Sequence, residues 1–266
     1  MPSASVNGAT LYYEERGEGR PVLFLHGTGA NSPAAWERCI DAMPPGRRLI
    51  TFDRRGFGRS GARLASGLQD HVNDAAALLQ HLGAAPAAVV TQSGGAVIAL
   101  QLAIDRPDLV NALVMAEPAY QVALHPSLSV TRALARTLGK WLLRRDLEGA
   151  ALHYYRWATR YETGGNAFDN YPLQWRRAGA EHARASLREV LQLVPPRPPA
   201  RAVRSLSCPV TLVVGDIGEP VFRRTTRRVH RLLPAARLAH VAETSHLIST
   251  DQPRAFAAAV AKALQA

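Results

Sequence analysis

An apolar, strand-like run that turns sharply through a serine into a helix is the feature that most constrains the fold of this sequence. Residues 87–90 have the apolar, partly β-branched character of a buried strand, and residues 96–104 follow with an apolar helical pattern. Between them, Ser93 is followed by Gly94 and Gly95, and glycine lets a strand and a helix pack closely because it has no side chain. Ser93 is therefore a candidate helix cap or a candidate exposed nucleophile.

The rest of the chain alternates strand-like and helix-like segments. Strands are expected at residues 9–15, 21–25, 49–52, 87–90, 112–115, 209–214 and 237–241. Helices are expected at residues 68–82, 96–104, 221–233 and 255–264. The sequence Gly17-Glu18-Gly19 between the first two strands indicates a hairpin. This alternation predicts an α/β fold, with a mostly parallel sheet covered by helices on both faces.

Residues 122–205 break the alternation with helix-like stretches and no convincing strand, and they end in a proline-rich linker at 195–199. Eight of the 17 aromatic residues fall in this segment: Trp141, Tyr154, Tyr155, Trp157, Tyr161, Phe168, Tyr171 and Trp175. Such side chains either line an apolar pocket or pack the helices against one another.

The net charge of +11 raises the question of a nucleic-acid partner. Residues 122–205 contain 14 lysine and arginine residues against 6 acidic ones, and therefore hold most of the excess. These cations are spread over several helices and interleaved with acids, which is typical of solvated helix faces. We expect no nucleic-acid partner.

Composition also indicates the number of domains and the cellular compartment. A chain of 266 residues with 47% hydrophobic residues favours one large domain with an insertion over two independent domains. Cys39 and Cys208 are far apart, which argues against a disulfide framework and fits a reducing cytosol. The N-terminus lacks a signal-peptide pattern and no apolar run is long enough to span a bilayer. We expect a cytoplasmic protein that does not contact membranes. A monomer and a homodimer both remain open.

Several motifs resemble those of the α/β-hydrolases. Thr91-Gln92-Ser93-Gly94-Gly95 resembles the family's nucleophile elbow, usually Gly-x-Ser-x-Gly, with Thr91 in place of the first glycine. Residues 25–31 resemble its His-Gly-x loop, and residues 53–60 match its Asp-x-Arg-Gly-x-Gly-x-Ser turn. The resemblance implies an α/β-hydrolase fold with Ser93 as the nucleophile. It also implies an oxyanion hole built from the backbone N–H groups of Thr28 and Gly94, with His26 shaping the loop.

The end of the chain resembles the same family. Residues 243–256 resemble its histidine loop, followed by the Asp-x-Pro-x-x-Phe start of the terminal helix. The resemblance implies that His246 is the general base, and we expect Asp251 to cap the helix.

The acid departs from the family's common pattern, which places an aspartate three residues past a glycine after the strand at 210–214. Counting from Gly215 reaches Gly218, while Asp216 and Glu219 are out of register. Residues 115–119, Met-Ala-Glu-Pro-Ala, instead resemble the zearalenone lactonases, which carry a glutamate after the preceding strand. We therefore assign Glu117 as the acid and keep Asp216 as the alternative. A solvated strand-end carboxylate is the other interpretation of Glu117.

The resemblance implies a serine hydrolase that cleaves an ester or lactone of a fairly apolar small molecule, and we expect no cofactor. We also expect no metal, because no group of histidine, cysteine or carboxylate residues has the spacing of metal ligands. Residues 1–121 and 206–266 would form the core domain, and residues 122–205 a helical cap that roofs the active site. Three rivals remain open. A C–C hydrolase or an acyltransferase uses the same residues. A cofactor-free oxygenase or cyclase often tolerates loss of the serine, and a ligand receptor on this fold turns over slowly or not at all.

Overall fold

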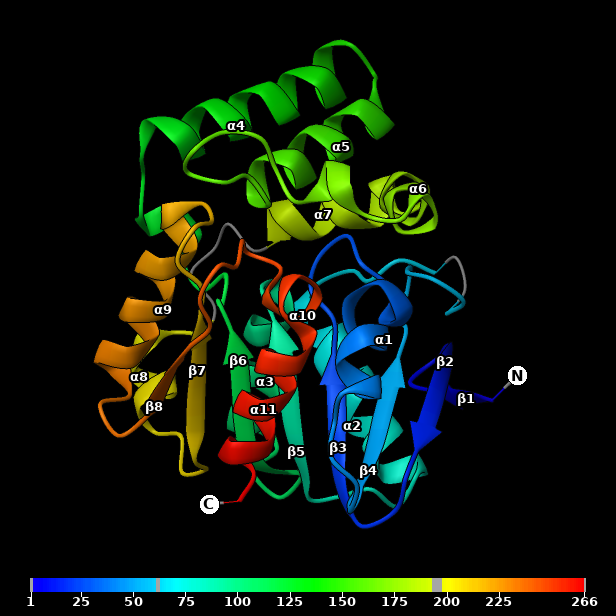
Figure 1. The fold of residues 1–266 in the computed structure, drawn as a ribbon. Helices are drawn as coiled ribbons and strands as arrows, with labels where there is room; N and C mark the ends of the chain where they lie inside the picture. Colours follow the sequence, from blue (N-terminus) through cyan, green and yellow to red (C-terminus); the bar gives the residue numbers. More distant parts are fainter. Residues whose placement is uncertain (1, 61–62, 193–197, 266) are drawn as a thin grey trace.

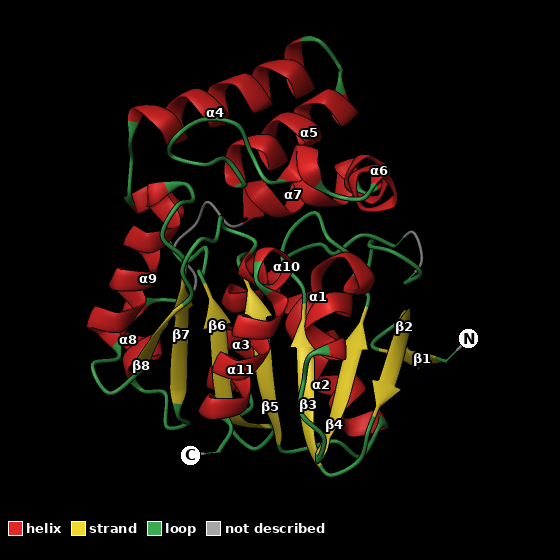
Figure 2. Cartoon of the chain, viewed as in Figure 1, coloured by secondary structure: helices red, strands yellow, loops and turns green. Residues whose placement is uncertain are grey.

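The computed structural model describes residues 2–60, 63–192 and 198–265. Within these ranges, eight strands form one sheet in the order β1-β2-β4-β3-β5-β6-β7-β8 (Figures 1 and 2). The strands are β1 (Ser3–Val6), β2 (Ala9–Arg16), β3 (Arg20–Leu25), β4 (Arg47–Phe52), β5 (Ala87–Gln92), β6 (Val110–Ala116), β7 (Val210–Val214) and β8 (Arg237–His240). The pairs β1–β2 and β2–β4 are antiparallel and the others are parallel, so the predicted mostly parallel α/β fold is confirmed.

The predicted hairpin between the first two strands is wrong. β4 lies between β2 and β3, with Tyr13 of β2 opposite Phe52 and Val22 of β3 opposite Leu49. The burial of the strands explains this order. The four residues Val22–Leu25 are buried and need a strand on each side, whereas β2 ends in partly or fully exposed charged residues and lies nearer the edge.

Helices cover both faces of the sheet. On one face lie α1 (Ser32–Asp41), α10 (Ile248–Asp251) and α11 (Pro253–Ala263), where Trp36 stacks on Phe256 with ring centroids 6.2 Å apart. On the other face lie α2 (Leu68–His81), α3 (Gly94–Asp105), α8 (Ala200–Arg204) and α9 (Pro220–Leu232). Both layers bury apolar side chains against the sheet, as a parallel sheet requires.

The helical segment, which comprises the helices between residues 122 and 192, lies above the carboxyl ends of the parallel strands (Figure 1). It includes α4 (Leu128–Leu138), α5 (Leu147–Ala158), α6 (Leu173–Glu181) and α7 (Ala183–Gln192). Three short turns of 3-10 or π-helix complete it: η1 (Val122–Leu124), η2 (Gly139–Leu143) and η3 (Phe168–Asn170). α8 packs against α3 and α9. Residues 195–197 of the predicted linker lie outside the described residues, and the division into core and cap stays a prediction.

None of the helices in the described ranges is both long and apolar enough to cross a bilayer.

Two buried histidines, His26 and His71, are expected to make the protein less stable at acidic pH. Burial and the nearby Arg54 charge hold the pKa of each imidazole well below its ordinary value of 6.5. Below pH 6.5 the unfolded chain therefore binds protons that the folded chain does not, so stability is present at neutral pH and is lost as the pH falls. Each histidine is expected to cost at most about 1.4 kcal/mol between pH 7.5 and pH 5.5, the limit for an imidazole that stays neutral in the folded protein.

Urea unfolding at pH 7.5 and pH 5.5 measures this loss. His71→Leu is expected to remove the share of this loss that His71 contributes. His81→Leu, at the exposed end of the same helix α2, serves as the control and is expected to leave it unchanged. Equal stability of the unmodified protein at the two pH values would contradict the prediction.

Candidate active site

Ser93 lies at the turn from β5 into α3, in a strained backbone conformation. Its φ of 55° and ψ of −125° fall in a region that residues with a side chain rarely adopt, and such strain is concentrated at functional sites. A Cβ on Gly95 would lie 2.7 Å from the carbonyl oxygens of Leu25 and His26, so the tight turn requires glycine there. The hydroxyl of Ser93 makes no capping hydrogen bond to α3. Ser93 therefore occupies the N-cap position of α3, but its hydroxyl does not cap the helix.

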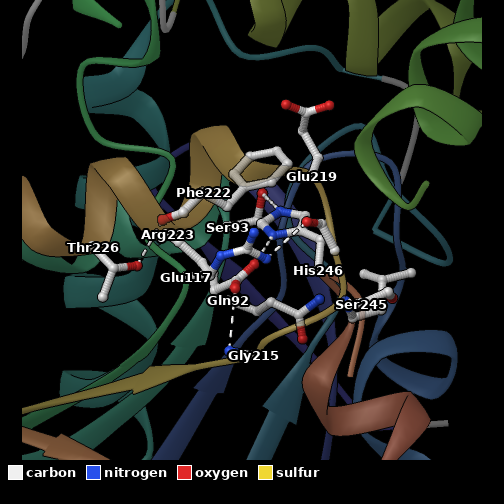
Figure 3. Close-up of polar contacts among 12 residues, drawn as sticks. Gln92, Ser93, Glu117, Gly215, Glu219, Phe222, Arg223, Thr226, Ser245 and His246 are labelled. Carbon is white, nitrogen blue, oxygen red and sulfur yellow. Dashed lines mark hydrogen bonds and ion pairs between the residues drawn. The ribbon is translucent and has the colours of Figure 1, made fainter. Parts of the chain in front are cut away.

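The structure brings Ser93, His246 and Glu117 together, although 153 and 129 residues separate the two hydrogen-bonded pairs (Figure 3). Ser93 Oγ lies 2.8 Å from His246 Nε2, and His246 Nδ1 lies 2.8 Å from Glu117 Oε2. An ionised carboxylate only accepts hydrogen bonds, so Nδ1 carries the imidazole proton and Nε2 is left to accept the proton of the serine hydroxyl.

Glu117 follows β6 and is 1% exposed, which contradicts the solvated strand-end interpretation. Its second oxygen, Oε1, accepts a hydrogen bond from the backbone N–H of Gly215 at 3.2 Å. Its φ of 39° is again in the left-handed region. Burying a carboxylate is costly unless it is paired, and here both oxygens have partners.

The other two acids near the end of β7 point elsewhere. Asp216 Oδ1 accepts from the backbone N–H of Thr244 at 3.2 Å. Glu219 caps the start of α9, and its carboxylate accepts from Ser129 Oγ at 2.8 Å and pairs with Arg160. Figure 3 shows the Glu219 carboxylate directed away from His246. Glu117 is thus the carboxylate that the structure sets against the imidazole.

The loop that carries His246 is held by Asp251, in a way the sequence interpretation missed. Asp251 Oδ2 accepts from the backbone N–H of Ser245 at 2.8 Å and from its hydroxyl at 2.6 Å. Burial raises the pKa of Asp251. The expected helix cap is wrong, because Asp251 ends α10 and Gln252 precedes α11.

Phe222 is a further residue of the site that sequence reasoning did not single out. Its ring stacks on the imidazole of His246 with centroids 3.4 Å apart and planes 13° apart (Figure 3). It lies on α9 and is 1% exposed, so its helical spacing made it look like an ordinary core residue. The stacking fixes the plane in which the imidazole presents its two nitrogens.

The two backbone groups predicted to bind an oxyanion flank Ser93. Gly94 is the first residue of α3, where backbone N–H groups have no partner within the helix. Thr28 lies in the loop after β3 and lines the same cleft as Ser93. A Cβ on Gly27 would lie 3.1 Å from Ser93 Cβ, so this loop passes directly beside the serine.

Ser93 and His246 open into a cleft roofed by the helical segment. Five of the eight aromatic residues noted in the sequence line it: Tyr154, Tyr155, Phe168, Tyr171 and Trp175. Its remaining walls are Gly27, Thr28, Gly29, Ala30, Ala34, Ala35, Gln92, Ala158, Thr159, Leu247 and Thr250. No aspartate, glutamate, lysine or arginine of the described ranges lines the cleft. It therefore suits an uncharged ligand with apolar or aromatic parts.

The strand order, the strained serine and its hydrogen-bonded partners define a family. The sequence model of the alpha/beta hydrolase fold family matches residues 20–253, and the chain belongs to that family.

Individual relatives are more distant. An uncharacterized hydrolase of Bacillus subtilis (strain 168), YraK, is 34% identical over 123 residues, which is 45% of each chain. The chain thus matches less than half the length of this curated relative.

Two solved structures match nearly the whole chain. A thermophilic esterase from Thermogutta terrifontis has a TM-score of 0.81 at 21% identity and covers 100% of this chain and 98% of its own. Est816, described as an N-acyl homoserine lactone degrading enzyme, has a TM-score of 0.77 at 19% identity, over 97% and 98%. At sequence identities this low, these TM-scores establish the shared fold and nothing further.

Proposed function

We propose that this protein is a serine hydrolase that cleaves a carboxylic ester or lactone of a fairly apolar small molecule through an acyl-enzyme. The observation that carries the proposal is the hydrogen-bonded chain from Ser93 through His246 to Glu117, at 2.8 Å for each contact. A serine hydroxyl is a weak nucleophile, and a histidine oriented by a carboxylate is the arrangement that activates it.

The steps follow from this chain. Ser93 Oγ attacks the carbonyl carbon while its proton passes to His246 Nε2. The carbonyl oxygen becomes an oxyanion, which the N–H groups of Thr28 and Gly94 stabilise. When the intermediate collapses, the alcohol leaves with the proton from His246. Water then attacks the acyl-enzyme and gives its proton to His246, which returns it to Ser93 Oγ as the acid product leaves. Glu117 stabilises the imidazolium in both acylation and deacylation.

The walls of the cleft support the substrate class. Five aromatic side chains and several alanines surround the serine, and the described part of the chain contributes no aspartate, glutamate, lysine or arginine to the cleft. A neutral ester or lactone enters such a cleft without leaving a charge unpaired, whereas a charged acyl group has no partner there. The resemblance of residues 115–119 to the zearalenone lactonases extends the proposal to macrolactones, and the fold shared with an esterase and a lactone-degrading enzyme agrees with it.

A fluorophosphonate probe is expected to label Ser93 in the folded protein. The probe phosphonylates only an activated serine, so one adduct per chain should form and hydrolysis of p-nitrophenyl esters should be lost in parallel. Intact mass spectrometry counts the adducts and peptide mapping locates them. Protein denatured before addition of the probe is the control and should stay unlabelled. Ester hydrolysis that survives complete labelling of Ser93 would contradict the proposal.

A further inference from the structure

We propose that Arg54 is a positioning residue for the oxyanion loop, and that it transmits to this loop the placement of helix α7 above the sheet. This inference rests on the proposed function, because it concerns the N–H of Thr28. Arg54 lies in the turn after β4, whereas its acidic partner Glu189 lies 135 residues away on α7. The pair therefore joins the sheet side of the cleft to its roof.

The guanidinium of Arg54 makes three hydrogen bonds in a buried position. Nη1 and Nη2 donate to the two carboxylate oxygens of Glu189, each at 3.0 Å, and Nη2 also donates to the carbonyl oxygen of Gly27 at 3.0 Å. The side chains of Arg54 and Glu189 are 1% and 5% exposed. The guanidinium also lies 4.7 Å from the ring centroid of Phe57. A rigid guanidinium fork can hold a carboxylate and a carbonyl at once, which a single ammonium group cannot.

His26 provides a second donor to the same carbonyl oxygen. Its Nε2 accepts from the backbone N–H of Arg54 at 3.0 Å, so the imidazole proton resides on Nδ1, which lies 2.9 Å from Gly27 O. The lowered pKa of His26 agrees with this neutral form. Gly27 O is thus held by one neutral and one charged donor.

The held carbonyl determines where the next N–H points. Gly27 C=O and Thr28 N–H belong to one planar trans peptide, so they point in opposite directions. Fixing the carbonyl toward Arg54 therefore fixes the Thr28 N–H away from it. A positive donor on the carbonyl also polarises the peptide and strengthens its N–H as a donor.

One turn away, α7 also acts on the same loop indirectly, through Tyr155 of α5. Ser186 and Glu189 are three residues apart and so lie on the same side of α7. Ser186 Oγ and Tyr155 Oη are hydrogen-bonded at 2.5 Å, and a Cβ on Gly29 would lie 2.0 Å from Tyr155 Cε1. One face of α7 thus bears on both ends of the segment 27–29. The geometry assigns this helix a role in the alignment of the loop as well as in covering the cleft.

The test is the double variant Arg54→Met/Glu189→Met. Replacing both members of a buried ion pair by apolar residues removes the charges together, and such replacements are often neutral for stability. The fold is therefore expected to be retained, while Gly27 O loses its charged donor. We expect kcat for a p-nitrophenyl ester to fall about 30-fold, less than the loss of a whole oxyanion donor, with KM unchanged within about threefold. The affinity for a phenylboronic acid, whose adduct with serine places an oxygen in the oxyanion hole, should fall by a similar factor.

Arg160→Gln is the control, because Arg160 also pairs with a buried glutamate, Glu219 of α9, and makes no hydrogen bond or ion pair with the 27–29 segment among the described residues. Its kcat should stay within about threefold of the unmodified protein. A folded double variant with unchanged kcat, or an equal fall of kcat in Arg160→Gln, would overturn the inference. If the double variant does not fold, Arg54→Lys decides in its place, since a lysine keeps the charge beside Glu189 but not the fork to Gly27. A fall in kcat at constant KM supports the inference, and an unchanged kcat overturns it.

Ser93→Ala separates this inference from the proposed function. If hydrolysis requires Ser93 but the double variant has normal kcat, only the role of Arg54 is wrong. If hydrolysis survives Ser93→Ala, the proposed function itself is wrong, and the double variant should then retain full activity.

Discussion

Ser93→Ala is expected to lower kcat/KM for p-nitrophenyl ester hydrolysis by at least about 10⁵-fold. Without the serine hydroxyl there is no nucleophile to attack the ester, so no acyl-enzyme can form. The folded structure should tolerate the change well. Ser93 is 9% exposed and its hydroxyl bonds to His246, so alanine leaves only a small gap beside the imidazole. Initial rates over a panel of aryl esters and lactones measure the effect, and thermal unfolding verifies the fold.

The matched control for this variant is Ser249→Ala, which removes a second buried hydroxyl near the cleft. Ser249 Oγ donates to Gln92 Oε1 at 2.7 Å, and no hydrogen bond joins it to His246 among the described residues. Rates should fall by less than about tenfold, since only a neutral hydrogen bond is lost. Activity that survives Ser93→Ala would favour the cofactor-free oxygenase or cyclase among the rivals. Undetectable turnover of every substrate by the unmodified protein would favour the ligand receptor.

Glu117→Gln is expected to lower kcat by at least about a hundredfold, while Asp216→Asn changes it little. The glutamine amide can donate to His246 Nδ1, and this places the imidazole proton on Nε2. A protonated Nε2 can no longer accept the proton of the Ser93 hydroxyl. The substitution also removes the negative charge that stabilises the imidazolium. The two variants make the same chemical change, carboxylate to amide, at the two positions that the sequence left in competition.

Asp216→Asn retains an oxygen that accepts from the N–H of Thr244, so the loop before His246 keeps its support. The pair should be compared by kcat and KM on one ester, with urea unfolding to correct for stability. A larger loss in Asp216→Asn than in Glu117→Gln would reassign the acid to Asp216.

Local patterns in the sequence were sufficient for much of the site. The turn around Ser93, the loop at residues 25–31 and the histidine loop near His246 are each formed by residues close together in the chain, and short-range sterics decide such turns. Position 95 requires glycine because a Cβ there would lie 2.7 Å from the carbonyl oxygens of Leu25 and His26, and this requirement is already visible as a Ser-Gly-Gly run. The alternation of strands and helices predicted the sheet for the same reason, since each element follows from its own periodicity.

Errors arose where a local pattern was used to assign the partner of a strand or of a side chain. Two strands joined by a short glycine-containing turn suggested a hairpin, but β4 entered between them because the apolar β3 needs neighbours on both sides. Asp251 looked like a helix cap, yet its carboxylate binds Ser245 within the histidine loop. In both cases the better-buried or better-bonded arrangement is available only when the chain has folded.

The sequence by itself determined the α/β class, through the alternation of its strands and helices, and it singled out the candidate serine and histidine, because each lies in a motif a few residues long. Only the tertiary structure decided which carboxylate meets the imidazole and that Arg54 joins α7 to the carbonyl of Gly27. The physical reason is that a hydrogen bond depends on distances of about 3 Å in space, whatever the separation along the chain. Glu117 and His246 meet because β6, β7 and β8 are adjacent parallel strands, with Glu117 directly after β6 and the loop of His246 after β8, so both lie at the same edge of the sheet.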